Sequence, residues 1–131
     1  MRILKAALKA LTLTLARRDY SELPQFANYD VRFLLDVREE DDSVVFTVEA
    51  ANTYDHSRAG WSKILIVFPK VKLTRWLRKE MQPLVDEDGS VYYGEIDSFI
   101  VNRDLSRVTG DWGEVEIVSE PIEVIEIEHC D

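Results

Sequence analysis

Several residue types are scarce in this chain, and each scarcity excludes a class of protein. Its 131 residues include one cysteine, Cys130, so no disulfide can form within the chain. Five glycines, four prolines and a hydrophobic fraction of 46% exclude a collagen-like or disordered chain. No apolar run approaches the roughly 20 residues that a membrane-spanning helix needs. We therefore expect a single domain over residues 1–131, located in a reducing compartment, the cytoplasm.

The amino-terminal segment, residues 1–18, contains five basic residues and no acidic one. A signal peptide needs an unbroken apolar stretch, which Lys5 and Lys9 interrupt. Leucines at positions 4, 8, 11 and 15 recur at helical spacing and predict a helix over residues 2–18. We expect this helix to pack its leucines on the rest of the fold. Contact with a membrane surface is the weaker alternative.

A second helix is predicted over residues 72–82. Leu73, Trp76, Leu77 and Met81 would share its apolar side, and Pro83 would end it. The basic residues at its amino-terminal end oppose the helix dipole, at a cost of about 0.3–1 kcal/mol each.

Six strands are predicted from alternation and from short apolar runs. Residues 31–38 and 44–50 form a hairpin, and residues 64–68 are apolar at every position. The remaining strands lie near residues 90–102, 113–119 and 121–128. In the last strand the alternation changes phase between Val124 and Ile125, which indicates either a β-bulge or a second apolar surface under Ile125. The order αβββαβββ predicts an α+β fold, with a mostly antiparallel sheet of about six strands and two helices on one face.

Charge is segregated along the sequence. The formal net charge is −9, yet residues 1–18 carry +5 and residues 58–79 carry +7. The last 24 residues contain eight acidic residues and no lysine or arginine. A balance of this kind disfavours nucleic acid as a partner and favours a basic protein.

An acidic sheet face is the candidate binding site. Residues of the last two predicted strands would place their carboxylates side by side, with an indole pushed outward by the glycines of the preceding turn. These candidate partner-binding residues are Trp112, Glu114, Glu116, Glu123, Glu126 and Glu128. Three alternatives remain open: the acids only confer solubility, they bind a cation, or the tryptophan folds back over the core.

Catalytic and metal sites receive little support. The polar loop 52–60 contains Asp55, His56 and Ser57, but consecutive side chains diverge and cannot form a triad. His129, Cys130 and Asp131 lack the spacing of a zinc site, and Glu95 with Asp97 lacks a third group of defined role. Residues 86–89 lack a calcium-loop pattern and are typical of a turn. We expect no cofactor, no metal and no catalytic residues, with His56 as the first place to look if the protein is an enzyme.

The sequence thus favours a non-enzymatic module that docks a basic protein through an acidic sheet face, as an inhibitor, an immunity-type protein or a nucleic-acid mimic would. One alternative is a small acidic chaperone or adaptor of a secretion or phage system, with the first helix as its partner or dimer face. An enzyme that uses loop 52–60 is a further alternative. The sequence leaves the oligomeric state open, a homodimer included, and indicates neither a nucleic acid nor a membrane as partner.

Overall fold

The computed structural model describes residues 17–19, 29–51, 60–102 and 105–130, and within these ranges every regular element is a β-strand. The predicted α+β fold with two helices is therefore wrong, and the described chain is all-β. Its strands are β1 (Arg17–Asp19), β2 (Asp30–Glu40), β3 (Ser43–Ala51), β4 (Trp61–Phe68), β5 (Leu73–Lys79), β6 (Leu84–Val85), β7 (Val91–Tyr92), β8 (Gly94–Ile100), β9 (Ser106–Gly110), β10 (Gly113–Val118) and β11 (Glu123–Cys130).

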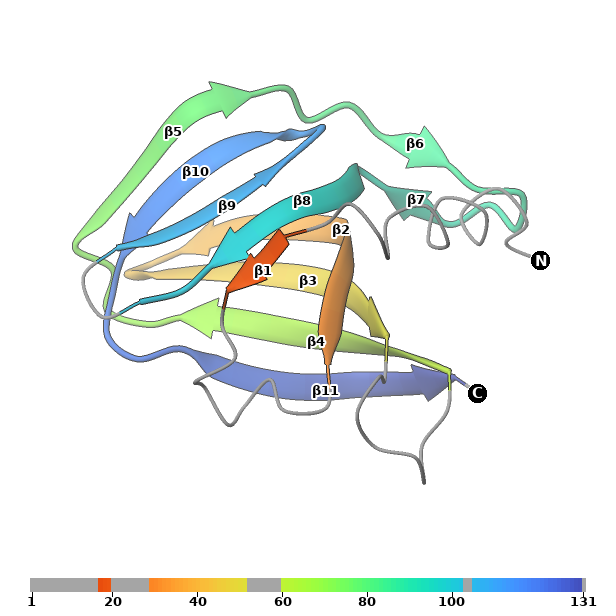
Figure 1. Ribbon diagram of the computed structural model, residues 1–131, viewed down its shortest axis with the longest axis horizontal. Helices are drawn as coiled ribbons and strands as arrows, with labels where there is room; N and C mark the ends of the chain where they lie inside the picture. The colour runs from red at the N-terminus through yellow and green to blue at the C-terminus, as the bar shows by residue number, and fades with distance from the viewer. Residues whose placement is uncertain (1–16, 20–28, 52–59, 103–104, 131) are drawn as a thin grey trace.

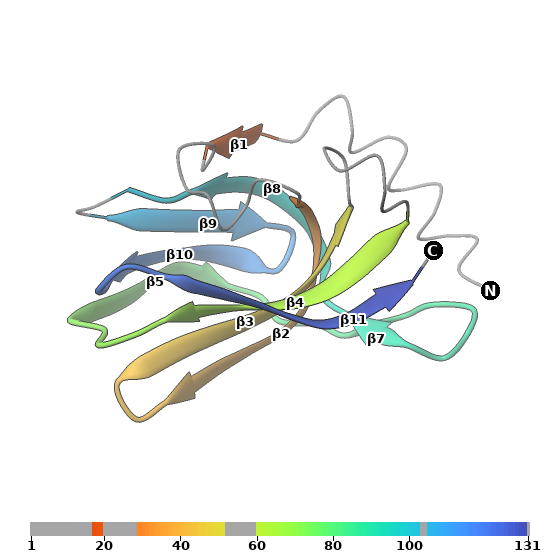
Figure 2. The same cartoon turned by 90° about the horizontal axis from the view of Figure 1, so that it is seen from below.

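Nine of these strands form one sheet (Figure 1). Its order is β11-β4-β3-β2-β8-β9-β10-β5, and β1 pairs with β8 in parallel, whereas the other pairs are antiparallel, as predicted. The two halves of the sheet meet at the short β2–β8 pair, where Phe33 lies opposite Glu95 and Leu34 opposite Gly94. Strands β11, β4, β3 and β2 make one layer, and β8, β9, β10 and β5 make the other (Figure 2).

The hydrophobic core lies between these two layers, because each contributes the inward side of its alternating strands. The Phe46 ring of β3 packs edge-on against Phe68 of its own layer, with centroids 5.6 Å apart. It also packs against Trp112 of the β9–β10 turn at 6.2 Å. Further fully buried members from the two layers are Val48, Ile64, Ile66, Ile96, Phe99, Val108 and Val115.

Two connections cross between the layers side by side. Residues 69–72 join β4 to β5, and residues 119–122 join β10 to β11. The amide of Lys72 donates to the carbonyl of Val118 at 2.8 Å, and the amide of Glu120 donates to the carbonyl of Pro69 at 3.0 Å. The pairs β4–β11 and β5–β10 therefore continue into one bent antiparallel ribbon. Its outer strand is β11 in one layer and β5 in the other, so this ribbon supplies both edges of the sheet order.

The helix predicted over residues 72–82 is instead the edge strand β5. Arg75 lies opposite Glu116 and Trp76 opposite Val115 of β10. Trp76 packs against the core, whereas Leu73 and Leu77 are each 48% exposed. The register shifts at Leu77, which is the extra residue of a β-bulge. The strand thus separates the apolar residues that a helix would have gathered on one face, and pairing with β10 determines which structure forms.

The helix predicted over residues 2–18 lies mostly outside the described residues, and its last two residues belong to β1. All six predicted strands are present: in β2, β3, β4, β10 and β11, and, for residues 90–102, in β7 and β8. Among the described residues, no helix has the length and apolar character needed to cross a membrane.

Candidate functional site

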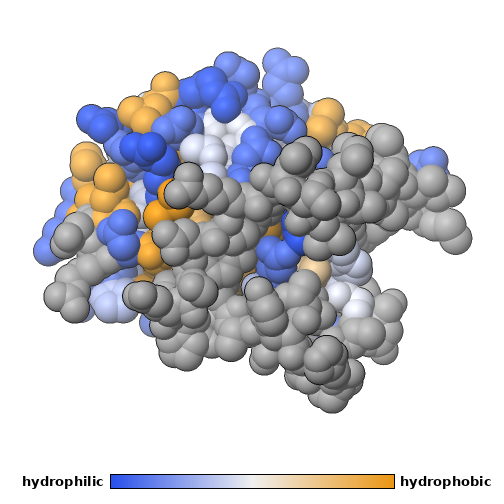
Figure 3. Space-filling view, in the orientation of Figure 1, coloured by the Kyte–Doolittle hydropathy of each residue, from blue (hydrophilic) through white to orange (hydrophobic). Residues whose placement is uncertain are grey.

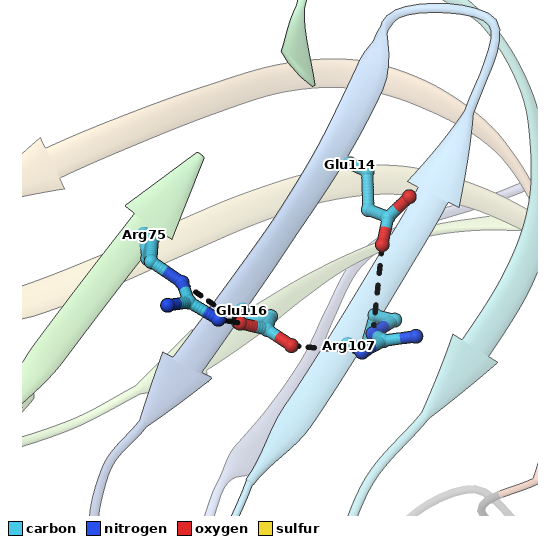
Figure 4. Close-up of polar contacts among 4 residues, drawn as sticks. All are labelled: Arg75, Arg107, Glu114 and Glu116. Atoms are coloured by element: carbon cyan, nitrogen blue, oxygen red, sulfur yellow. Dashed lines mark hydrogen bonds and ion pairs between the residues drawn. The ribbon is translucent and has the colours of Figure 1, made fainter. Parts of the chain in front are cut away.

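The carboxylates of Glu114 and Glu116 lie on the outer face of β10, between β9 and β5 (Figure 4). Because Val115 and Ile117 point into the core, the alternating glutamates point away from it. Arg107 of β9 and Arg75 of β5 lie opposite Glu116 on its two sides. The predicted acidic face therefore contains two arginines. Arg107 belongs to none of the predicted strands, and Arg75 belongs to the helix predicted over residues 72–82.

Glu116 is held by both arginines. Nη2 of Arg107 donates to Oε2 at 2.8 Å, and Nε of Arg75 donates to Oε1 at 3.0 Å, with a second contact from Nη2 of Arg75 to the same oxygen. Glu114 Oε2 lies 3.6 Å from Nε of Arg107. The Glu116 side chain is only 5% exposed. This residue has a structural partner on each side and is not available to a docking protein.

These contacts shift the ionisation of both partners. The hydrogen bond from Arg107, followed by that from Arg75, lowers the pKa of Glu116 below its ordinary value, although burial opposes the shift. The hydrogen bond to Glu116 raises the pKa of Arg107. The ion network across β5, β10 and β9 therefore favours the charged forms of Glu116 and Arg107.

Glu116→Gln is expected to lower the melting temperature at pH 7, because it removes the charge that both arginines contact. Since the pKa of Glu116 is lowered on folding, its stabilising contribution is present above the ordinary glutamate pKa of about 4.3. The contribution is lost as the pH falls through the lowered value. The difference between wild type and variant should thus be largest near neutral pH and shrink in acid, as measured by thermal unfolding from pH 7 to about pH 2.

A matched control for that measurement is Glu123→Gln, which removes the same charge from an exposed position. Glu123 makes no ion pair within the described ranges, so its variant should follow the wild-type profile. Parallel profiles for wild type and Glu116→Gln would contradict the assigned network.

Glu123, Glu126 and Glu128 lie on β11, in the other layer. β11 pairs with β4, whereas β10 pairs with β9 and β5. The expectation that the five carboxylates stand on neighbouring strands is therefore wrong, because the connection 119–122 carries the chain to the other layer instead of closing a hairpin. The other three glutamates share strand β11 but lie on both of its faces, since Glu126 is opposite the buried Ile64 whereas Ile125 beside it points outward.

We call this group, with Ile125 and Ile127, the acidic edge. Ile125 is 45% exposed and Ile127 is 50% exposed. The Glu128 carboxylate lies 3.3 Å from Nζ of Lys63, and the glutamate side chain is 54% exposed. Oε1 of Glu126 accepts hydrogen bonds from the Tyr29 hydroxyl at 3.0 Å and the Ser62 hydroxyl at 2.8 Å. The edge combines apolar surface with negative charge, and Lys63 of the neighbouring strand β4 pairs with one of its three carboxylates.

The β-bulge in β11 lies further along than predicted. The register runs unbroken from Glu123 to Glu126, and Ile127 is the extra residue between Glu126 and Glu128. Ile125, opposite Leu65, lies on the outer face rather than over the core. The predicted β-bulge is thus present in this strand, but it lies after Glu126 rather than between Val124 and Ile125, and Ile125 is 45% exposed.

Trp112 is not an outward anchor. Its side chain is fully buried, and its ring packs edge-on against Phe46 and, at 6.1 Å, against Trp76. The two glycines of the turn allow the indole to fold back between the layers, which is the alternative that the sequence left open. A surface contact through this side chain is therefore excluded.

His129 belongs to a polar chain on the inner side of β4 and β11. Its Nδ1 lies 3.0 Å from Oγ of Ser62, whose hydroxyl donates to Glu126. In a catalytic triad the carboxylate contacts the histidine, but here the carboxylate contacts the serine. The arrangement ties the two strands and Tyr29 together, and Ser62 itself is 1% exposed.

The other chemical candidates are placed as follows. Loop residues 52–59, with Asp55, His56 and Ser57, lie outside the described residues, as does Asp131. Residues 86–89 form the predicted turn, with the amide of Gly89 donating to the carbonyl of Asp86 at 3.0 Å. Within the described ranges, no three histidine, cysteine, aspartate or glutamate side chains gather as a metal site would require.

One feature that sequence reasoning missed is the opposite edge of the sheet. β5 and the preceding connection contain five basic residues, Lys70, Lys72, Arg75, Arg78 and Lys79, and residues 69–79 contain no acidic one. The +7 charge of residues 58–79 was the available signal, but the helix prediction concealed that these charges follow an edge strand.

No protein-family model, characterised protein or solved structure matches this chain. Its function has to be inferred from its own residues and geometry. The clearest candidate for a binding site is β11, an edge strand that carries three glutamates and two exposed isoleucines.

Proposed function

We propose that this protein is a non-enzymatic binding protein of the cytoplasm that captures a basic protein partner through the acidic edge. The observation that carries the proposal is the combination of Ile125 and Ile127, each about half exposed, with three glutamates on the outermost strand of the sheet. An edge strand presents backbone N–H and C=O groups that an added strand can pair with.

The partner segment is expected to be extended, basic and partly apolar. The unbulged half of β11, residues 123–126, offers a regular ladder, whereas the bulge at Ile127 interrupts it. Lysine or arginine side chains of the added strand would lie near the glutamates, and its aliphatic side chains would cover the isoleucines. Charge complementarity of this kind mainly raises the association rate and makes it sensitive to salt.

The five-carboxylate face expected from the sequence is replaced by this narrower site. Glu116 and Trp112 are excluded because they are buried, and Glu114 because it lies in the other layer beside Arg107. The chaperone or adaptor alternative depends on the helix predicted over residues 2–18, of which residues 2–16 lie outside the described residues, so no observation supports it.

The proposal is tested by titrating a fluorescent peptide of alternating lysine and valine into the protein and measuring its anisotropy. Wild type is expected to bind, and Glu123→Gln combined with Glu128→Gln should weaken binding about fivefold to tenfold, since each exposed charge contributes about 0.2–1 kcal/mol. This loss of affinity should shrink as the salt concentration rises from about 50 to about 300 mM.

The matched control is Glu39→Gln combined with Glu87→Gln, which removes the same charge from exposed positions on β2 and the β6–β7 turn. This control should bind the peptide like wild type. Equal weakening in both double variants would assign the effect to net charge and would rule out the acidic edge as the site.

A further inference from the structure

The basic strand β5 resembles the acidic edge, because both carry two exposed aliphatic side chains, but the charged residues of β5 are positive. Leu73 and Leu77 are each 48% exposed, as Ile125 and Ile127 are on β11. In Figure 3, hydrophobic patches alternate with hydrophilic surface along the upper left border, where β5 runs in Figure 1. We call β5 with Lys70 and Lys72 the basic edge.

These two edges terminate the same sheet. The strand order begins with β11 and ends with β5, and Figure 1 shows them along opposite borders of the molecule. Each has one regular ladder segment, residues 73–76 and 123–126, next to a bulge whose extra residue is an exposed aliphatic. Every copy of the chain therefore presents both an acidic edge and a basic edge.

Charge decides which edges can meet. Two copies of β11 would oppose carboxylates, and two copies of β5 would oppose ammonium and guanidinium groups, and like charges directly opposite one another destabilise a strand pair. A symmetric dimer through equal edges is thus disfavoured. Only the pairing of β5 with β11 places opposite charges together.

We propose that the chain associates head to tail, with the basic edge of one copy against the acidic edge of the next. The inference rests on the proposed function, because it names a second copy as the basic partner of β11. An interface between two different surfaces is heterologous, so each bound copy presents a further free edge. The assembly then continues into a ring or a filament.

Charge exchange between the edges tests the proposal. In one variant Lys70→Glu, Lys72→Glu and Lys79→Glu change the basic edge from five positive charges to a net charge of −1. In the other, Glu123→Lys and Glu128→Lys change the acidic edge from three negative charges to a net charge of +1. None of these residues contacts the Glu116 network or the Trp112 ring. Circular dichroism and thermal unfolding establish that both variants are folded.

Sedimentation velocity then measures the mass of each protein over a range of concentrations. Wild type should show a mass that rises with concentration above the 15.2 kDa of one chain. Each variant alone should associate at least tenfold more weakly, because its two edges carry the same sign. An equimolar mixture of the two variants should recover association, since each edge then finds its opposite.

Recovery in the mixture is an outcome that misfolding cannot produce. A wild type that stays monomeric, or a mixture that stays as weak as its components, overturns head-to-tail association. If that monomeric wild type still binds the lysine–valine peptide, the proposed function survives without the second copy as partner. If it binds no peptide either, both proposals fail.

Discussion

Replacing Trp112 with alanine is expected to lower the free energy of unfolding by about 3–5 kcal/mol. The indole is fully buried between the layers, where it packs against Phe46 from β3 and Trp76 from β5. Truncation removes both ring contacts and leaves a cavity that the two sheet halves cannot fill without moving. Since domains of this size are stable by about 5–15 kcal/mol, the loss is a large part of the total.

Urea unfolding followed by circular dichroism measures this loss. The midpoint should fall while the slope stays near its wild-type value. Leu77→Ala provides the control, because this leucine is 48% exposed and should change stability by less than about 1 kcal/mol. A loss below about 1 kcal/mol for Trp112→Ala would contradict its position between the layers.

The parts of the fold that could be predicted are those whose pattern is local. The hairpin of β2 and β3 follows from alternation on both sides of a charged turn, and the pair is present with Val37 opposite Phe46. The turn at residues 86–89 follows from its aspartates and Gly89, whose φ is +84°. Local chemistry decides these elements, so distant partners do not alter them.

β5 could not be predicted from its own residues. Leucine and tryptophan at helical spacing satisfy a helix as well as a bulged edge strand, and helix propensity is a weak preference that pairing overrides. The strand forms because β10 lies beside it, and β10 is some 40 residues further along the chain. The unfavourable cations at the start of the predicted helix were the single local sign of this outcome.

For the candidate site, the sequence predicts only which residue types are present, not how they pair. The sequence predicts that the last strand is rich in glutamate, but the partners of Glu116 depend on strand register. Arg107 and Arg75 reach it from two different neighbours, one of which had been assigned to a helix. A nonlocal pairing thus converted part of the predicted acidic surface into an ion network, while the other three glutamates lie on the edge strand β11.

Gly110→Ala is expected to lower stability by about 3 kcal/mol, at the upper end of the usual cost of overpacking. Gly110 ends β9 opposite Ile96 and Gly113. A Cβ at this position would overlap the carbonyl oxygen of Glu95 and Nε1 of Trp112, and Cδ1 of that indole would be 3.0 Å away. Neither obstacle can yield easily, because one is backbone in the sheet and the other is wedged between the layers.

Gly89→Ala separates this steric effect from backbone strain. Gly89 has φ of +84° with nothing within 4 Å of the added Cβ, so its cost is conformational, about 1–2 kcal/mol. Gly110 lacks a positive φ, and its larger cost arises only from the close approach of β8 and Trp112. Urea unfolding of both variants should therefore rank Gly110→Ala as the less stable. The reverse order would mean that β8, β9 and the indole are not packed as closely as the structure places them.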